Sequence, residues 1–453
     1  MEPFRYHVFV CDQQKSEGVP CCAGRGSAGV VDALRREIAI QGLIDAVQVT
    51  LCGSLGLCPH GPNMVVYPEG IWYSGVTTGD VAEIVRSHFG EGDVVERLAR
   101  IDTEGLRAEI LSSREKMQAA MRARDAAGVL PDDLMQTVRS FQESRVILTA
   151  LELDLFSALG TGASGPEAAG KIGADSRATE MLLNALCAMR LLKKDGGIFH
   201  NTPVSSRYFV AGSPDCARGS LMHTVNLWTR WSTLTDCVKG GTSVTRDESE
   251  ELGADWTQAF MAAMDRSARE RAPLVVQAVG AGRYQRMLDV GGGPAAYSIA
   301  FCRANPALEA EVFDRPSVVA IAQSHIEGAG LSSRIRTRAG DILRDGLGGG
   351  FDLVLVSQIC HSLSEEENLG LLKKCHAALT PGGTLVIQEF ILDADKASPK
   401  WGALFALNML VGTRAGNAYS EEEMTGWMRA TRFGEIRRVR LPGPSGLILG
   451  TRG

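Results

Sequence analysis

The last two hundred residues alternate between short apolar runs and stretches with helical spacing. The apolar runs are MLDV, EAEVFD, RIRTRA, FDLVLVSQ and GTLVIQEF. Strands that alternate with helices in this way predict a parallel, doubly wound sheet. The sequence therefore predicts a Rossmann-like α/β domain over residues 255–453.

The first 95 residues carry a second α/β pattern. HVFVC and VQVTL are typical of short strands, and residues 27–40 place Val30, Val31, Leu34 and Ile38 at helical spacing. MVVY and IWY flank a turn with Pro and Gly, which predicts a hairpin. Asp80 is the expected N-cap of a last helix. The order β-α-β-β-α indicates one compact domain over residues 1–95.

The middle of the chain is predicted to be helical. Residues 96–130 are charged and rich in Ala, which favours a solvated helical connector. Residues 131–250 contain an apolar helical stripe, and Gly196 and Gly197 then break the helix before a short strand. Two helices followed by a hairpin are typical of a winged helix. The second helix is rich in Met and Leu, and this favours a dimerisation and substrate-covering module over DNA binding.

Composition narrows the classes of partner. The chain has 453 residues, enough for two to four domains, and a net charge of −6. An acidic chain disfavours a nucleic-acid partner, because phosphate binding needs a basic face. No apolar run approaches the roughly 20 residues of a membrane span. The first residues lack the features of a secretory signal, so we expect a cytoplasmic protein.

A glycine turn and acidic strand ends predict a nucleotide-type ligand. MLDVGGG is a strand followed by glycines, and Asp314 ends the next strand 25 residues after Asp289. A dinucleotide fingerprint is met only in its permissive form. An acid before the glycines suits a ligand with a cationic end, and Asp314 suits a ribose. The candidate cofactor-binding residues are Asp289, Gly291, Gly293, Asp314, Gly340, Asp341 and Ser357.

His361 is the candidate general base. It follows the apolar strand DLVLVSQ, so it lies at the strand end where ligands of such sheets bind. Histidine can take a proton near neutral pH, which suits an acceptor hydroxyl. The alternative interpretation is a surface histidine that begins a helix.

These segments resemble the caffeate-type O-methyltransferases. LDVGGG, FDRPSVV, AGDIL, CHSLSEEENLGLLKKC and TPGGTLVIQEFIL carry the resemblance, which extends over residues 131–453. It implies a class I fold that binds S-adenosylmethionine, a winged-helix dimerisation domain, a homodimer and a small aromatic or conjugated acceptor. It also places the base at His361 and an orienting acid at Glu389.

The sequence departs from this family at two positions. Ser362 replaces an acid after the base, and a second acid that brackets the base falls on Ala418, with Glu421 to Glu423 close by. The resemblance also implies that the acceptor pocket is lined from the helical domain and from residues 401–413. The candidate lining residues are Met264, Trp231, Phe405, Asn408 and Met409.

Five of the eleven cysteines lie in the first 58 residues. HVFVC, PCCAGRGS, GSLGLCPHGP and VVYPEGIWY resemble the thioredoxin-like 2Fe–2S ferredoxins over residues 4–90. The resemblance implies a cluster held by thiolates, and Ser54 stands where that family has a cysteine. The implied metal ligands are Cys11, Cys22, Cys58 and either Cys52 or Ser54, with Cys21 as a second spare. The alternative is a ferredoxin-shaped docking module without a cluster.

Three functions stay open at this stage. The first is methyl transfer to a small acceptor. The second keeps the S-adenosylmethionine pocket but uses the iron–sulfur domain, and a possible electron-transfer partner, for decarboxylation, hydroxylation or demethylation. The third is a DNA-binding redox regulator, against which the acidic charge counts.

Overall fold

The computed structural model describes residues 3–15, 19–128, 130–245 and 254–453. The chain divides into two units, Met1–Phe141 and Gln142–Gly453. The predicted boundary at residues 250–255 falls largely in 246–253, which lie outside the described residues.

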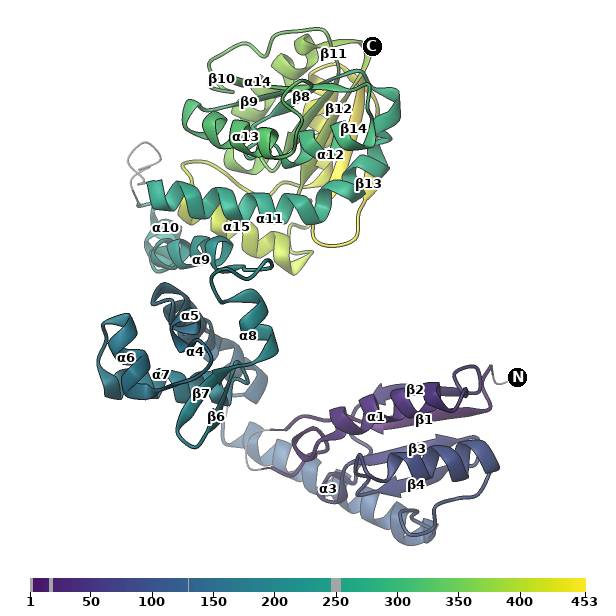
Figure 1. Ribbon diagram of the computed structural model, residues 1–453. Helices are drawn as coiled ribbons and strands as arrows, with labels where there is room; N and C mark the ends of the chain where they lie inside the picture. The colour runs from purple at the N-terminus through teal and green to yellow at the C-terminus, as the bar shows by residue number, and fades with distance from the viewer. Residues whose placement is uncertain (1–2, 16–18, 129, 246–253) are drawn as a thin grey trace. The chain divides into compact units, whose positions relative to one another are not determined.

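The first unit contains a four-stranded sheet of order β2-β1-β3-β4 (Figure 1). β1 and β2 are parallel, while β3 is antiparallel to both β1 and β4. The order of the elements matches the predicted β-α-β-β-α. They are β1 (Tyr6–Cys11), α1 (Ser27–Ile40), β2 (Val47–Cys52), β3 (Asn63–Tyr67), β4 (Ile71–Ser74) and α2 (Val81–Ile84), which continues as a π-helix (Val85–Glu91).

The predicted connector is one long helix, α3 (Thr103–Ala126). Most of its described side chains are exposed, as expected, but its first turns pack against the small sheet domain. Leu106 is buried, and Ile110 lies against Gly56, whose missing Cβ would be 3.0 Å from it. The start of the connector is therefore part of the first unit's packing. α4 (Asp132–Glu152) follows.

The second unit begins with the helical domain. Two helices, α6 and α7, precede the hairpin β6–β7, as predicted, and β5 completes a three-stranded sheet. The elements are α5 (Leu155–Leu159), β5 (Ala163–Ser164), α6 (Gly165–Ile172), α7 (Ser176–Ala188), β6 (Leu192–Asp195), β7 (Ile198–Asn201), α8 (Pro203–Tyr208), α9 (Arg218–Trp231) and α10 (Leu234–Gly240).

The C-terminal domain is a seven-stranded sheet of order β10-β9-β8-β11-β12-β14-β13 (Figure 1). The first five strands in this order are parallel, as predicted. β14 runs antiparallel to both β12 and β13, which the sequence reasoning did not foresee. The strands are β8 (Arg286–Val290), β9 (Glu309–Asp314), β10 (Ile335–Ala339), β11 (Phe351–Ser357), β12 (Leu379–Glu389), β13 (Phe433–Arg440) and β14 (Gly446–Arg452).

Helices cover both faces of this sheet with separate apolar cores. One core contains Leu371 of α14 and Trp427 of α16, and the other contains Val275 of α11 and Phe301 of α12. Alternate residues of each strand enter the two cores. The helices are α11 (Ala254–Val279), α12 (Ala296–Ala304), α13 (Pro316–Gly328), α14 (Glu365–Ala378), α15 (Lys400–Gly412) and α16 (Glu421–Ala430).

Among the helices that the structure describes, none combines the length and the apolar character that crossing a membrane requires.

Candidate functional site

The glycine turn follows β8 and leads into α12. Gly291 has φ of 66°, and a Cβ there would lie 2.3 Å from Cδ1 of Ile359. Gly293 has φ of 53°, but a Cβ there would meet no atom within 4 Å. Gly291 therefore lets the turn pack closely on the protein, whereas Gly293 faces open space that a ligand could fill.

Asp314 ends β9 and joins the glycine turn. Its carboxylate accepts hydrogen bonds from the backbone N–H of Gly293 at 2.9 Å and of Arg315 at 2.7 Å. Burial raises the pKa of this carboxyl, and the two N–H donors oppose that effect. The structure thus brings together two of the predicted cofactor residues at adjacent strand ends.

Asp289 lies beneath the turn instead of facing the open space. Its side chain is 0% exposed, and a Cβ on Gly292 would lie 2.8 Å from its Cγ. Ser298 of α12 donates to one carboxylate oxygen at 2.7 Å, and the other oxygen has no hydrogen-bond partner among the described protein atoms. Burial raises the pKa of Asp289 to about 6. This placement favours support of the turn over direct contact with a ligand's cationic end.

The other predicted cofactor residues are engaged in local contacts. Asp341 accepts from the backbone N–H of Leu343 at 2.8 Å, which closes its own loop after β10. A Cβ on Gly340 would collide with the ring of Phe313, so the loop requires glycine there. Ser357 ends β11 and donates to the side chain of Gln388 at 2.9 Å.

His361 and Glu389 form a hydrogen-bonded pair. Nδ1 of His361 lies 2.8 Å from Oε2 of Glu389, and their side chains are 12% and 1% exposed. β11 and β12 are parallel neighbours, with Ser357 opposite Gln388, so their carboxyl ends present both residues at one edge of the sheet. A carboxylate can only accept, so Nδ1 carries the proton and Nε2 keeps a lone pair. The pair can act as an oriented base.

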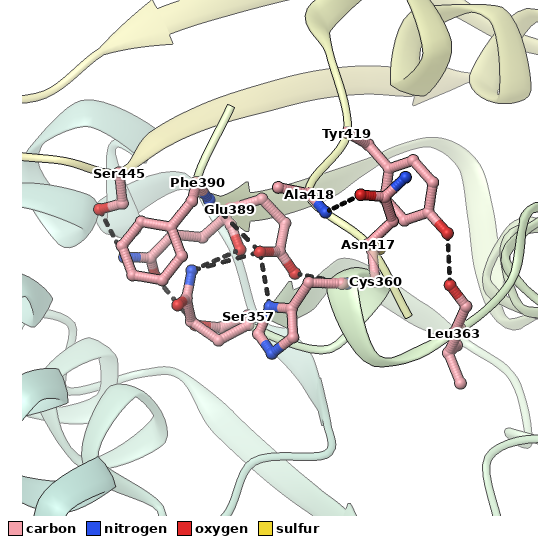
Figure 2. A network of polar contacts seen from close by, with 12 residues as sticks. Ser357, Cys360, Leu363, Glu389, Phe390, Asn417, Ala418, Tyr419 and Ser445 are labelled. Atoms are coloured by element: carbon pink, nitrogen blue, oxygen red, sulfur yellow. Dashed lines mark hydrogen bonds and ion pairs between the residues drawn. The ribbon is translucent and has the colours of Figure 1, made fainter. Parts of the chain in front are cut away.

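The Glu389 carboxylate is held by more than the imidazole (Figure 2). Oε1 accepts from the backbone N–H of His361 at 3.3 Å, while Oε2 accepts from that of Phe390 at 3.3 Å and from Nε2 of Gln358 at 3.4 Å. Gln358 has φ of 57° in the turn after β11. Gln358 was not among the predicted site residues. The sequence around it does not indicate that a left-handed turn directs its amide at the Glu389 carboxylate.

The second bracketing acid of the resembling family is absent here. Ala418, 1% exposed, occupies the position, and Figure 2 shows it beside Asn417, whose backbone N–H donates to the carbonyl of His361 at 2.8 Å. Glu421 pairs with Arg438, and Glu423 caps α16 through Ser420. These two nearby glutamates are therefore committed elsewhere.

An aromatic side chain packs against the imidazole, and a second one packs behind it. Phe405 of α15 meets the ring of His361 edge to face, with centroids 4.8 Å apart, and packs on Phe390 at 4.5 Å. The guanidinium of Arg271 lies 5.5 Å from the centroid of Phe390. Phe405 was among the predicted lining residues, whereas Phe390 and Arg271 were not. Such a surface suits a flat, apolar ligand.

The helical domain reaches this region through α9. Nε1 of Trp231 donates to Oδ1 of Asn408 on α15 at 2.9 Å, and Arg230 donates to the carbonyl of Gly412 at 3.1 Å. Trp231 and Asn408 thus lie together, and their role in lining an acceptor pocket stays a prediction. Met264 is half-buried on α11 and Met409 is buried on α15, and no described contact joins either of them to His361.

A second polar cluster lies in the first unit, at the end of β1. The interaction with Cys22 lowers the pKa of Cys11, while the same interaction and burial raise the pKa of Cys22. Asn63 donates to the sulfur of Cys22 at 3.4 Å. Both cysteines are fully buried.

Ser54 and Cys58 form a second pair in this cluster. Oγ of Ser54 lies 3.3 Å from Sγ of Cys58, and Ser54 is exposed whereas Cys58 is buried. Cys52 is half-buried at the end of β2, directly opposite Cys11 in the parallel register. Cys21 is buried and accepts from the N–H of Gly24 instead.

Within the described residues, no group of three or more His, Cys, Asp or Glu side chains is arranged to hold a metal ion. A 2Fe–2S cluster takes four protein ligands. Of the implied ligands, Cys11, Cys22 and Cys58 are buried, Cys52 is half-buried and Ser54 is exposed. The side-chain N–H of Asn63 directed at the sulfur of Cys22 suits a ligand thiolate, because it stabilises negative charge on sulfur.

Two family models match the chain beyond residue 134. Residues 135–211 match the O-methyltransferase dimerisation domain, and residues 241–433 match the O-methyltransferase domain. The 3-hydroxy-5-methyl-1-naphthoate 3-O-methyltransferase of Streptomyces sahachiroi is 34% identical over 331 residues, which cover 71% of this chain and 95% of the relative. The tetracenomycin polyketide synthesis 8-O-methyl transferase TcmO of Streptomyces glaucescens is 27% identical, covering 71% and 97%. Human N-acetylserotonin methyltransferase, solved in complex with SAM, is 25% identical with a TM-score of 0.63, covering 71% and 96%.

Proposed function

The chain belongs to the family of SAM-dependent O-methyltransferases, and we propose that it methylates a hydroxyl group on a small aromatic or conjugated molecule. One observation carries the proposal: the hydrogen-bonded pair of His361 and Glu389 lies at a strand edge beside the glycine turn and among aromatic side chains. The relatives that act on naphthoate and polyketide substrates by name support the acceptor class.

The residues around the glycine turn fit the methyl donor. The open space at Gly293 admits a ligand against bare backbone, and the Asp314 carboxylate beside it can accept from ribose hydroxyls. S-adenosylmethionine, when bound there, supplies an electrophilic methyl group on a sulfonium centre. The chain's part is to align the acceptor and to remove its proton.

Proton removal falls to His361. Glu389 holds Nδ1–H, so the lone pair of Nε2 is free to accept the hydroxyl proton as the oxygen becomes nucleophilic. The imidazolium that forms is stabilised by the adjacent carboxylate, which is itself held by Gln358 and backbone N–H groups. Phe405 and Phe390 exclude water from the base and offer apolar faces to an aromatic ring. The dimerisation-domain match at residues 135–211 supports a homodimer.

The test is product formation by the full chain. We expect S-adenosylhomocysteine and a methylated product in equal amounts with at least one compound from a panel of phenols and hydroxynaphthoates. His361→Gln should lower kcat about 100-fold or more, and His376→Gln on α14 is the matched control. If calorimetry detects S-adenosylhomocysteine binding but no acceptor is methylated, the redox-coupled alternative gains ground and the O-methylation proposal fails.

We also propose that the first unit holds a 2Fe–2S cluster. The support is the resemblance of the N-terminal segments to the thioredoxin-like ferredoxins together with three buried cysteines, Cys11, Cys22 and Cys58, the last of which lies 3.3 Å from Oγ of Ser54. A Cβ on Gly61 would lie 2.5 Å from the sulfur of Cys22, so only glycine permits this close approach. Such a cluster would allow this unit to accept or donate single electrons.

Adjacent cysteines provide the control for the cluster. We expect iron and sulfide in equal amounts after anaerobic reconstitution of the full chain. Cys22→Ala should abolish the visible spectrum, whereas Cys21→Ala, one residue away and bonded to Gly24, should keep it. A chain that takes up no iron, or one in which both variants behave alike, would contradict the proposal.

A further inference from the structure

We infer that Arg271 is a specificity-determining residue that binds a carboxylate on the acceptor, so that the chain selects aromatic hydroxy acids over neutral phenols. The inference rests on the proposed function and defines its acceptor class more closely.

Arg271 is joined to the base by a series of aromatic contacts. It is half-buried on α11, and the central carbon of its guanidinium lies 5.5 Å from the ring centroid of Phe390. Phe390 directly follows Glu389 at the end of β12. It packs on Phe405, whose ring meets that of His361. A cation at one end of two aromatic rings and a base at the other end suit a flat acceptor with a negative charge remote from its hydroxyl.

The charge of Arg271 has no counter-ion within the described part of the chain. There, its guanidinium forms neither an ion pair nor a hydrogen bond. Its neighbour on the same helix, Arg269, pairs with Asp265 at 2.8 Å. The N–H donors of arginine form a planar fork that matches the two oxygens of a carboxylate. A half-buried cation of this geometry is therefore available to a ligand.

Tyr297 of α12 shows that Arg271 also lies close to the donor turn. Burial raises the pKa of the Tyr297 hydroxyl, and the positive charge of Arg271 is one of the effects that oppose it. Tyr297 follows Gly293 closely in the sequence. The acceptor and the methyl donor could each supply a carboxylate, because the methionine portion of the donor carries one. The acceptor is the source that the geometry supports, because Phe390 extends β12, and β11 separates β12 from β8, which leads into the turn.

The test compares a hydroxynaphthoate with its primary amide as acceptors of the full chain. The two compounds share the ring, the hydroxyl and the size, but only the acid is charged. Wild type should convert the acid with a kcat/KM at least about 10-fold above that for the amide. Arg271→Met keeps an apolar side chain without the charge and should lose this preference, while Arg271→Lys should keep part of it. Arg269→Met, on the same helix, is the matched control and should keep the preference in full.

Binding without turnover provides a second readout. The Kd of the acid for the chain saturated with S-adenosylhomocysteine should rise at least about 10-fold in Arg271→Met. The Kd of S-adenosylhomocysteine itself should stay unchanged. Calorimetry measures both constants, and equal thermal unfolding midpoints show that the variants fold.

The outcomes separate the inference from the proposed function. Equal conversion of acid and amide by the wild type would overturn the inference and leave O-methylation in place. Weaker binding of S-adenosylhomocysteine in Arg271→Met, with an unchanged ratio between acid and amide, would assign the cation to the donor's carboxylate and also overturn it. Binding of the acid that depends on Arg271, without any methylated product, would support the carboxylate site and remove the O-methylation proposal.

Discussion

Nδ1 of His361 lies 2.8 Å from Oε2 of Glu389, and the carboxylate also accepts from the backbone N–H of the same histidine. The two contacts fix both the position of residue 361 and the tautomer of its ring. His361 therefore depends on Glu389 as a hydrogen-bond acceptor. An amide side chain of the same shape would not replace the carboxylate.

Glu389→Gln should therefore lower kcat by about 100-fold or more, since the amide can donate to Nδ1 and favours the wrong tautomer. The KM for S-adenosylmethionine should change little, because the cofactor turn does not contact Glu389. Glu327→Gln, an exposed carboxylate on α13, is the control. Steady-state kinetics with a methylated acceptor measure both constants, and a fall confined to the KM of the cofactor would contradict the positioning role.

Asp289 should make stability depend on pH. Burial raises its pKa from 3.8 to about 6. Between these two pH values the folded state therefore keeps a proton that the unfolded state has already lost. The stabilisation is present below pH 4 and is lost as the pH rises through the window from about 4 to 6, by about 3 kcal/mol for a shift of this size. Asp289→Asn should remove this dependence, as urea unfolding at pH 4.5 and 7.5 would show. Parallel pH profiles for the two proteins would place the raised pKa elsewhere.

The two glycines of the turn should respond differently to alanine. Gly293→Ala places a methyl group in open space and should cost about 1–2 kcal/mol for its positive φ, but it should weaken S-adenosylhomocysteine binding at least 10-fold. Gly291→Ala drives a methyl group into Ile359 and should destabilise the fold more. Calorimetric titration and urea unfolding measure the two effects. Unchanged binding in Gly293→Ala would move the cofactor away from this turn.

Much of this site could be predicted from the sequence, because parallel strands present their carboxyl ends at one edge. That rule placed His361 at a ligand-binding strand end and Asp314 near Gly293, while the family resemblance supplied Glu389 as the partner of His361. The orientation of Asp289 was not predicted from its position, although strand alternation places it on the same face as Met287, which is buried against α12 and its neighbours.

Other features depend on tertiary contacts that no local pattern encodes. Gln358 reaches Glu389 only through a left-handed turn. Spacing indicated the N-terminal cysteines, but the bond from Asn63 to Cys22 joins residues that are 41 positions apart. The antiparallel strands β13 and β14 were missed because the apolar pattern of Phe433–Arg440 is weak, with Glu and Arg at half of its eight positions.

Trp231→Phe should weaken the contact between the helical domain and α15. The variant loses the bond from Nε1 to Asn408, which is worth about 1 kcal/mol, but keeps most of the ring's apolar surface. We expect a higher KM for the acceptor with unchanged S-adenosylhomocysteine affinity, since the glycine turn is not involved. Trp72→Phe, in the first unit, serves as the control. Equal effects on cofactor and acceptor would indicate a general structural defect.

Gly61→Ala tests whether the space beside Cys22 is required by the cluster site. Gly61 has φ of −70°, so alanine meets no backbone strain there, but its Cβ would lie 2.5 Å from the sulfur of Cys22. The sulfur must move, and iron content after reconstitution should fall by at least half. Gly53→Ala is the matched control in the neighbouring loop, because its Cβ would come no closer than 3.9 Å to another side chain. If both variants bind iron like the wild type, the sulfur of Cys22 does not need its present position, and its assignment as a ligand loses its geometric support.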